Sequence, residues 1–373
     1  MRDSLLELIS SYDAAAPLER AWTIPAGWYF DQRIAELERH NVFGGSWQAV
    51  GRAEQVAQPG QFITTEIAGE PIVVVRGVEG VLRAFYNVCR HHAAAVMTEQ
   101  AGCAQLLRCP YHGWTYGLDG ALKGAPEFTG VESFNPGQNG LMPVRVEVWE
   151  KFVFVALEQN AAPLKEFIGE LAGRVAPLNL GRVKFVERHR YELNCNWKVY
   201  VDNYLDGGYH VPHLHKGLNS VLEYRDYTIE NGERFCVQAS PMRSSSEGES
   251  SVTATRAGDM AYYLWLYPNF MLNWYEGAMD TNLVLPLGTD RTLVIFDFYF
   301  AESWPAERVR QSIEVSDRIQ GEDVAICEAV QRGLRSRAYN AGRLSIRREA
   351  GEHLFHRLLA ADLKRGIKRG AAV

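Results

Sequence analysis

Residues 196–215 read NWKVYVDNYLDGGYHVPHLH and place three histidines and two aspartates within fourteen residues. Asp206 and His210 are four residues apart, so on a helix they would share one face. His210 and His215 are five apart, but Pro212 and the Gly207–Gly208 pair let the backbone leave regular helical geometry. Both rings could then reach one metal ion, and with a carboxylate from elsewhere they would form the facial triad of a non-haem Fe(II) site. The alternative is a helix with core histidines.

The composition is that of an ordinary globular protein. The 373 residues are enough for two domains, and the net charge of −6, with acidic and basic residues mixed, argues against a nucleic-acid partner. The N-terminus lacks the apolar core of a signal peptide, and the most apolar stretch, Ala261–Leu272, is too short to span a bilayer. We therefore expect a cytoplasmic protein without a membrane partner, whose cysteines are reduced.

The pattern of apolar, polar and glycine residues along the chain predicts three parts. Residues 1–40 form an amphipathic helical segment, which we expect to pack on the last part of the chain. Residues 41–155 contain short β-rich runs separated by glycine turns, which predicts a small antiparallel β domain. These runs are Phe62–Ile67, Ile72–Arg76, Leu82–Tyr86, Val144–Trp149 and Phe152–Val155.

Residues 156–373 predict a larger domain with an antiparallel sheet flanked by helices, so the whole chain is of the α+β class. A long helix is expected from Pro305 to about Ser336, followed by a charged C-terminal tail. The expected strands are Val186–Leu193, Asp259–Asn273, Thr281–Pro286 and Thr292–Phe300.

The strongest motif is a repeated Cys/His pattern in the β-rich region. Cys89-Arg-His91 and Cys109-Pro-Tyr-His112 are separated by seventeen residues, and each pair follows a strand-like run. Two thiolates and two imidazoles could hold zinc or a [2Fe–2S] cluster. In a Rieske centre the thiolates bind one iron and the imidazoles bind the other. The one- and two-residue spacers differ from common zinc-finger spacings, which favours the Rieske cluster over structural zinc.

A single carboxylate interrupts an apolar stripe on the long helix. Burying an unpaired carboxylate is costly, so Asp323 needs a cation or hydrogen-bond donors. An ion pair with arginine is the alternative to a metal. Glu322 and Glu328 fall off the stripe, and we expect them to be solvated. The apolar members of the stripe are Ile319, Ile326, Cys327, Val330 and Leu334.

Several aromatic residues could line a substrate pocket near the histidines. His213 is close to the other histidines in sequence, and we expect it in the pocket and not as a metal ligand. Some of the aromatic side chains could form a box for a quaternary ammonium group, although core packing is the alternative for any single one. The candidates are Tyr204, Tyr209, Trp265, Tyr267, Phe270, Trp274 and Tyr275.

These motifs resemble the Rieske non-haem iron oxygenases, the ring-hydroxylating oxygenase α subunits, over nearly the whole chain. Residues 202–212 (DNYLDGGYHVP), 267–273 (YPNFMLN) and 280–286 (DTNLVLP) look most like the choline monooxygenase branch, whose relatives include carnitine and betaine oxygenases. The family motifs are Gly45-Ser-Trp47, Asn87-Val-Cys89-Arg-His91, Cys109-Pro-Tyr-His112-Gly-Trp114, Asn196-Trp-Lys198 and Tyr209-His210.

The resemblance implies two metal cofactors. A Rieske [2Fe–2S] cluster would be bound in a domain of residues 41–155 by Cys89, His91, Cys109 and His112. A mononuclear Fe(II) would be bound in a catalytic domain of residues 156–373. Its implied ligands are His210, His215 and Asp323, the last being part of the Glu322-Asp323 motif, and Asn203 would lie near the iron.

The resemblance also implies a path for electrons. Many relatives place a bridging acid three residues before the first histidine ligand, but that position here is Gly207. We therefore expect Asp206 to join a cluster histidine to an iron-ligand histidine, with Asp202 as the second candidate. Since the two metals within one subunit of this family are too far apart for fast transfer, a head-to-tail homotrimer is implied. No nucleotide-binding fingerprint stands out, so a separate reductase or ferredoxin would supply electrons, and NAD(P)H would act only through it.

The implied reaction is an O2-dependent hydroxylation or oxidative demethylation of a small substrate. The choline branch favours a quaternary or substituted ammonium compound such as choline, carnitine or a betaine. Hydroxylation or O-demethylation of an aromatic acid is the rival within the same class. The rivals from other classes are a Rieske electron-transfer protein with an inactive second site, and a zinc-stabilised binding module. The presence of His210, His215 and Asp323 together argues against an inactive site.

Overall fold

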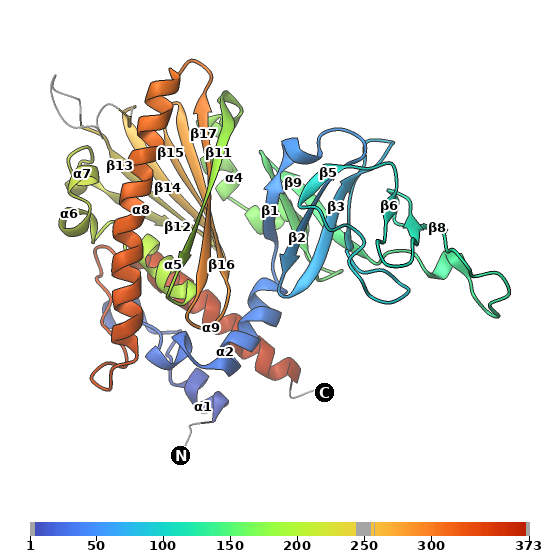
Figure 1. The fold of residues 1–373 in the computed structure, drawn as a ribbon. Coiled ribbons are helices and arrows are strands. Elements are labelled where there is room, and N and C mark those ends of the chain that lie inside the picture. The colour runs from blue at the N-terminus through green and yellow to red at the C-terminus, as the bar shows by residue number, and fades with distance from the viewer. Residues whose placement is uncertain (1–3, 244–254, 257, 371–373) are drawn as a thin grey trace. The chain divides into compact units, whose positions relative to one another are not determined.

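The protein, in a computed structural model that describes residues 4–243, 255–256 and 258–370, consists of two compact units (Figure 1). One unit is Arg39–Phe167, and the other combines Met1–Glu38 with Ile168–Val373. Each contains a seven-stranded sheet in which all pairs are antiparallel. The α+β class expected from the sequence is therefore confirmed.

The Arg39–Phe167 unit is a small β domain. Its main sheet has the order β1-β10-β9-β4-β3-β2-β5, and a second sheet has the order β6-β7-β8. Val73 and Val75 point to one face of β3, where they share a hydrophobic cluster with Cys89 and Cys109, whereas Val74 belongs to a cluster on the other face. The strands are β1 (Gln48–Arg52), β2 (Gln61–Ile67), β3 (Glu70–Arg76), β4 (Leu82–Tyr86), β5 (Ala101–Cys103), β6 (Leu107–Arg108), β7 (Thr115–Tyr116), β8 (Leu122–Gly124), β9 (Pro143–Trp149) and β10 (Phe152–Ala156).

The second unit is built on a sheet of order β11-β17-β16-β15-β14-β13-β12. The single strand expected from Asp259 to Asn273 is in fact two strands. The chain reverses at Tyr267–Asn269, around Pro268, and the two strands pair with each other. The strands are β11 (Val183–Leu193), β12 (Thr228–Asn231), β13 (Phe235–Pro241), β14 (Met260–Leu266), β15 (Phe270–Tyr275), β16 (Ala278–Pro286) and β17 (Thr292–Ala301).

Helices cover one face of this sheet, and Figure 1 shows the long α8 running along it. The segment expected to be a charged tail is the helix α9, which buries Phe355, Leu359 and Leu363 at a spacing of four residues. None of the helices in the described ranges is both long and apolar enough to cross a membrane. The helices are α1 (Leu5–Ser10), α2 (Gln32–Glu38), α3 (Leu164–Ile168), α4 (Leu171–Val175), α5 (Trp197–Leu205), α6 (Val211–Leu214), α7 (Lys216–Asn219), α8 (Ala306–Leu334) and α9 (Ala350–Gly370).

A buried ion pair anchors the start of α5, the helix that leads to the histidines. The side chain of Asn196 caps α5 by accepting from the backbone N–H of Lys198. The Nζ of Lys198, which is fully buried, donates to Glu38 Oε1 at 2.6 Å, and Trp197 Nε1 donates to Glu38 Oε2 at 2.9 Å. Burial lowers the pKa of Lys198, and the charge of Glu38 opposes that shift. Glu38, at the end of α2, therefore connects α2 to α5, and it is the carboxylate that pairs with the buried Lys198.

The variant Glu38→Ala is expected to lower the free energy of unfolding by about 3–5 kcal/mol, because it leaves the Lys198 ammonium buried without a counter-ion. Chemical denaturation followed by tryptophan fluorescence would measure the loss. The double variant Glu38→Met/Lys198→Met is expected to recover most of it, since apolar residues of similar volume often replace a buried ion pair without cost. A single variant within about 1 kcal/mol of the wild type would contradict this view of the pair.

Candidate metal centres

Two loops of the same geometry carry Cys89 and Cys109. The amide of the residue four positions after each cysteine, Ala93 or Gly113, donates to the carbonyl oxygen of that cysteine. Ala93 and Gly113 both have a positive φ, of 61° and 72°, so each loop turns sharply at the same place. Both cysteines are buried, and neither is in a disulfide. The fold thus presents two thiols in matching local environments.

The two imidazoles of the motif come from the same loops. The ring centroids of His91 and His112 lie 4.7 Å apart, and the ring of His91 stacks on that of Trp114. Nδ1 of His91 is buried and has no hydrogen-bond partner among the described residues, which fits a nitrogen reserved for a metal. The hydroxyl of Tyr116 lies 3.3 Å from Cys89 Sγ, where it could donate to a metal-bound thiolate. The donor set fits a Rieske [2Fe–2S] cluster.

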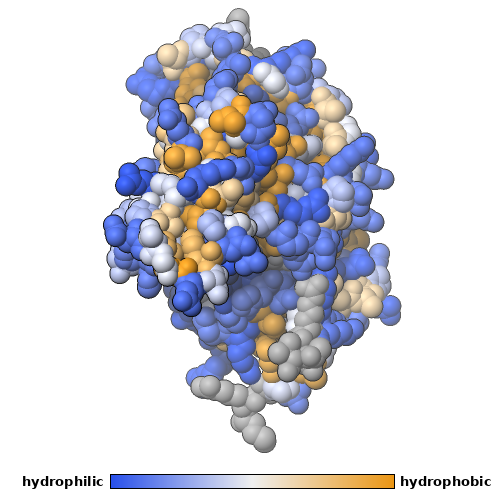
Figure 2. All heavy atoms as spheres, turned by 90° about the vertical axis from the view of Figure 1, so that its right-hand side faces the viewer, coloured by the Kyte–Doolittle hydropathy of each residue, from blue (hydrophilic) through white to orange (hydrophobic). Residues whose placement is uncertain are grey.

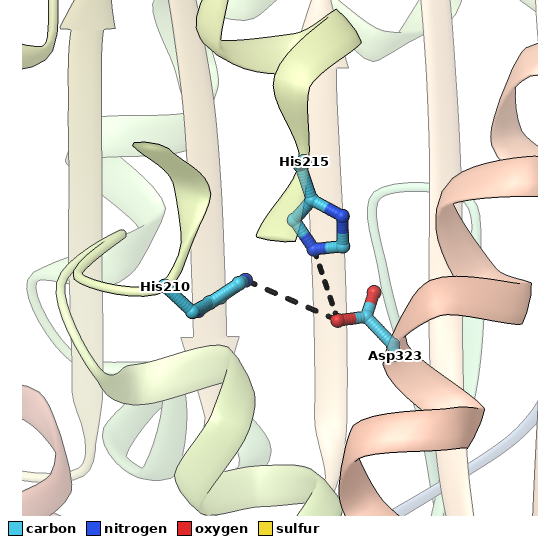
Figure 3. A group of neighbouring side chains, drawn as sticks. All are labelled: His210, His215 and Asp323. Carbon is cyan, nitrogen blue, oxygen red and sulfur yellow. Dashed lines mark hydrogen bonds and ion pairs between the residues drawn. The ribbon is translucent and has the colours of Figure 1, made fainter. Parts of the chain in front are cut away.

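His210, His215 and Asp323 meet in the second unit (Figure 3). The Nε2 atoms of His210 and His215 lie 3.9 and 3.1 Å from Oδ1 of Asp323. The histidines flank α6 and the aspartate comes from α8. One donor atom from each residue lies within 4.8 Å of the other two, which is close enough for one ion. Two imidazoles and a carboxylate are the donors of a facial triad, which leaves other positions on the metal open.

Asp206 contacts His210 across a turn, and not along one face of a helix as the spacing predicted. α5 ends just before Asp206, and Gly207 and Gly208 follow with φ of 68° and 67°. The turn returns His210 to Asp206, whose Oδ2 accepts from the His210 backbone N–H at 3.0 Å and lies 2.6 Å from Nδ1. A Cβ at Gly207 would lie 2.1 Å from the carbonyl oxygen of Arg348. Glycine is therefore required at residue 207, and residue 206 supplies the acid.

Glu322, which we expected to be solvated, instead contacts His215. Its Oε2 lies 2.6 Å from His215 Nδ1, although the carboxylate remains 38% exposed. Burial opposes protonation of His215, but its hydrogen bonds with Asp323 and Glu322 and their charges outweigh this effect and raise its pKa. A carboxylate at Nδ1 thus directs Nε2 of each histidine toward Asp323, as in many metal sites.

Removal of the Glu322 carboxylate is expected to weaken iron retention. Without this acceptor the His215 ring is less well oriented, so Glu322→Ala should lower the affinity for iron by about 10- to 100-fold. Iron measured after dialysis against graded chelator would test this. Glu328→Ala is the control, because Glu328 lies on the same helix and accepts from the backbone N–H and side-chain amide of Asn194. Equal iron retention in the two variants would contradict the assigned role.

Asn203 and Asp202 lie on different sides of α5. Nδ2 of Asn203 donates to Asp323 Oδ1 at 2.8 Å, so this amide is beside the triad. Asp202 instead accepts from the hydroxyl of Tyr29 at 2.6 Å, and its other oxygen lies 3.0 Å from His356 Nε2. Asp206 therefore contacts a triad histidine, whereas the contacts of Asp202 are with the N-terminal segment and α9.

A cavity of about 110 Å³ adjoins the triad, between the sheet and the helices. Of the side chains expected in a substrate pocket, Tyr204 and Tyr275 line it, whereas Tyr209, Tyr267 and Phe270 do not. Trp265 does not, because it is fully buried against Phe355 of α9. Trp274 points to the opposite face of β15 from Tyr275, and His213 is exposed. The cavity-lining side chains from the sheet are Tyr263, Asn273, Tyr275, Asp280, Asn282 and Phe296.

Three further tyrosines of the cavity, Tyr200, Tyr227 and Tyr263, were not expected from the sequence. Tyr227 stacks on Tyr263 with ring centroids 6.3 Å apart, and the Tyr263 hydroxyl lies 2.9 Å from that of Tyr275. Tyr204 donates to the side chain of Asn273 at 2.8 Å. We call Tyr204, Tyr227, Tyr263 and Tyr275 the tyrosine cluster. Burial raises the pKa of all four of its phenols, so they stay neutral.

Asp280 is a buried carboxylate in the same cavity. It is 5% exposed, and its Oδ2 accepts from Asn273 Nδ2 at 2.8 Å and from Asn282 Nδ2 at 3.0 Å. Burial raises the pKa of Asp280, and the charge of Arg256 and the two amides act in the opposite direction. The cavity therefore combines neutral aromatic rings with a desolvated acidic group.

The chain is similar to known proteins over nearly its whole length. Residues 46–135 match the Rieske [2Fe-2S] domain family, and residues 180–364 match the ring hydroxylating alpha subunit (catalytic domain). The chloroplastic choline monooxygenase of Arabidopsis thaliana is 40% identical over 371 residues, covering 96% of this chain and 87% of that protein. The carnitine monooxygenase oxygenase subunit of Escherichia coli (strain K12) is 34% identical over 361 residues, covering 93% and 95%.

Solved structures agree with this similarity. The quaternary ammonium Rieske monooxygenase CntA in complex with its substrate L-carnitine matches with a TM-score of 0.82 at 29% identity, covering 97% of this chain and 99% of that one. Naphthalene 1,2-dioxygenase from Rhodococcus sp. matches with a TM-score of 0.76, covering 91% and 94%. At 19% identity, this second match shows a common fold alone.

Proposed function

The chain belongs to the Rieske non-haem iron oxygenases, the ring-hydroxylating oxygenase α subunits, and we propose that it oxidises a small quaternary or substituted ammonium compound. Like other members of the family, it is an oxidoreductase that uses O2 and reductase-supplied electrons and carries a Rieske cluster and a mononuclear iron. The observation that carries the substrate class is the desolvated Asp280 carboxylate, which shares the cavity at the triad with the tyrosine cluster.

We infer that each unit holds one metal centre. In the Arg39–Phe167 unit, Cys89 and Cys109 would bind one iron of the cluster, and His91 and His112 would bind the other. In the other unit the iron would be bound by the facial triad. The cluster supplies electrons one at a time, and the mononuclear iron, when bound, supplies the open positions that O2 activation needs. The proposed ligands of that iron are His210, His215 and Asp323.

The cavity residues suit a cationic substrate. The faces of tyrosine rings carry partial negative charge and attract ammonium groups, most strongly when water is excluded. When it is ionised, Asp280 adds a negative charge in a buried place where few waters could screen it. The named substrates of two relatives, choline and carnitine, are both quaternary ammonium compounds, which supports this assignment. Tyr204 and Tyr275 of the tyrosine cluster were among the candidates for an aromatic box, whereas the candidates Trp265 and Trp274 do not line the cavity.

We further propose a head-to-tail homotrimer in which Asp206 passes electrons between subunits. Asp206 contacts His210 and keeps part of its surface exposed, at 15% of the side chain, so a histidine of another subunit could reach it. The structure of a quaternary ammonium Rieske monooxygenase that is 31% identical to this chain has been described in terms of inter-subunit electron transfer, which supports the same arrangement here. A closed ring of this kind uses one heterologous contact three times.

The Arg39–Phe167 unit also exposes apolar side chains that suit the docking of an electron donor. Tyr111 is 64% exposed, and its ring centroid lies 3.8 Å from that of the proposed cluster ligand His112. Figure 2 shows hydrophobic residues among hydrophilic ones on one face of the molecule. We propose that a separate reductase or ferredoxin docks on exposed apolar residues of this unit other than Tyr111, because Tyr111 adjoins an imidazole of the pair that the proposed homotrimer places near Asp206 of the next subunit. The other exposed apolar residues of the unit include Val78, Val81, Leu106, Val131 and Met142.

A single-turnover assay tests the substrate class. The iron-loaded protein would be reduced chemically, exposed to O2 with choline, carnitine, several betaines and several aromatic acids, and analysed by mass spectrometry. We expect an oxidised or demethylated ammonium compound. Oxidation of an aromatic acid alone would retain the reaction type but overturn the proposed substrate class.

A further inference from the structure

Arg256 places a buried positive charge in the cavity that adjoins the triad. The residue is 7% exposed, and its two Nη atoms donate to the hydroxyls of Ser312 and Ser316 at 2.9 and 2.8 Å. Its guanidinium carbon lies 4.6 Å from the ring centroid of Tyr275. These partners are neutral, and Nε has no hydrogen-bond partner among the described residues. Within those residues, no ion pair joins Arg256 to a carboxylate.

A buried guanidinium with only neutral hydrogen-bond partners would be stabilised by an anion. Buried charges in proteins are normally paired, because neutral hydrogen-bond partners do not repay the loss of hydration. Arginine is also the side chain best suited to a carboxylate, which it can bind through two parallel N–H donors. Since Arg256 lines the cavity, a ligand in that cavity can reach this side chain.

Asp280 is the opposite charge in the same cavity, and it does not neutralise Arg256 directly. The charge of Arg256 influences Asp280, but the two side chains form no ion pair within 4 Å among the described contacts. Asp280 instead has amide partners on its own sheet, from Asn273 and Asn282. The cavity therefore contains a cationic side chain, Arg256, and an acidic side chain, Asp280, that do not pair with each other, so both could contact a ligand.

We infer that the ammonium substrate also carries a carboxylate, which Arg256 binds while Asp280 and the tyrosine cluster hold the ammonium group. This inference rests on the proposed function and narrows it to zwitterionic betaines. Choline has the same trimethylammonium group with a hydroxyl and no carboxylate, so it would leave Arg256 unpaired. A site with such an unpaired buried group rejects the analogue that lacks the complementary partner.

A competition experiment tests the inference. The iron-loaded, chemically reduced protein would receive choline, glycine betaine, γ-butyrobetaine and L-carnitine at equal concentrations with O2, and each product would be quantified by mass spectrometry. We expect at least one carboxylate-bearing compound to be oxidised about 10- to 100-fold more than choline. Titration calorimetry of the same four compounds would show the same order of affinity without depending on turnover.

Substitution of the arginine assigns this preference to one side chain. Arg256→Met should reduce oxidation and binding of the preferred betaine by about 10- to 100-fold, whereas those of choline should not fall, because choline has no carboxylate for Arg256 to bind. The control is Arg310→Met, because Arg310 lies on α8 with its side chain 65% exposed, and it should match the wild type.

The outcomes separate the inference from the proposed function. Oxidation of choline as well as or better than every betaine overturns the inference and leaves the proposed function standing. An unchanged betaine preference in Arg256→Met also overturns it. If the iron-loaded protein oxidises no ammonium compound, the proposed function fails and the inference fails with it. Should Arg256→Met not retain iron, the wild-type ratio of betaine to choline products decides alone.

Discussion

Asp323→Ala is expected to remove the mononuclear iron and leave the Rieske cluster intact. Oδ1 of Asp323 is the atom that faces the Nε2 atoms of both triad histidines, so the variant loses one of three proposed protein ligands. Iron should fall from about three to about two atoms per chain, since the cluster keeps its own pair. Product formation should fall by more than about 100-fold, which exceeds the usual effect of removing a residue that only supports a ligand.

The measurement is iron content together with the visible spectrum of the cluster. Glu328→Ala serves as the control, since it removes a carboxylate from the same helix without touching the triad. If Asp323 only paired with His215 and bound no metal, its variant would keep about three irons. A variant that lost the cluster spectrum would contradict the assignment of the two centres to separate units.

The proposed metal ligands were the part of the site that the sequence indicated most directly, because ligand chemistry leaves a local pattern. The spacers around Cys89 and Cys109 indicated the Rieske cluster without any knowledge of the sheet beneath them. Asp323 was found because one carboxylate interrupted an apolar stripe. The stripe itself was only partly right, since Ile326 and Val330 are 38% and 44% exposed. The spacing of apolar residues predicted the helix correctly, but it did not predict which side chains of α8 are buried.

The cavity was harder to predict, because its walls come from pairings between distant segments. Alternation along β14 and β15 separates two faces, but it does not say which face meets the helices. Tyr263 and Tyr275 face the cavity, whereas Trp274 does not. Trp265 lies on the same face of β14 as Tyr263, two residues away, but its ring packs against Phe355 of α9 and does not reach the cavity. Its burial could not be foreseen while α9 was expected to be a charged tail.

The contact between Glu322 and His215 could not be predicted from the sequence, for a different reason. The position of Glu322 beside Asp323 on the helix placed it off the buried stripe, and the side chain is indeed partly exposed. The contact with His215 depends on where the short α6 ends, which neither periodicity nor composition predicts. The carboxylate that we propose as a metal ligand therefore leaves a clearer trace in the sequence than the one that we propose to orient a histidine.

Asp206→Asn is expected to keep both metal centres occupied and to slow the reoxidation of the reduced cluster by about 10- to 100-fold. In the wild type Oδ1 accepts from the backbone N–H of Tyr209 and Oδ2 accepts from that of His210. The amide oxygen of asparagine replaces one of these two acceptors, so the turn should keep one of its two side-chain hydrogen bonds. What is lost is the negative charge that faces Nδ1 of His210 at 2.6 Å. Stopped-flow absorbance of the reduced protein, mixed with O2 and substrate, would measure the rate.

Asp202→Asn is the matched comparison, because this acid lies one turn earlier on α5 and contacts Tyr29 and His356 in place of a triad histidine. Its cluster should be reoxidised at a rate within about threefold of the wild type, because the proposed path does not use it. The reverse result, with slow reoxidation in Asp202→Asn and a normal rate in Asp206→Asn, would make Asp202 the bridging acid. Electrons would then pass through a carboxylate that contacts His356 and the N-terminal segment, so the proposed contact between subunits would have to be placed there.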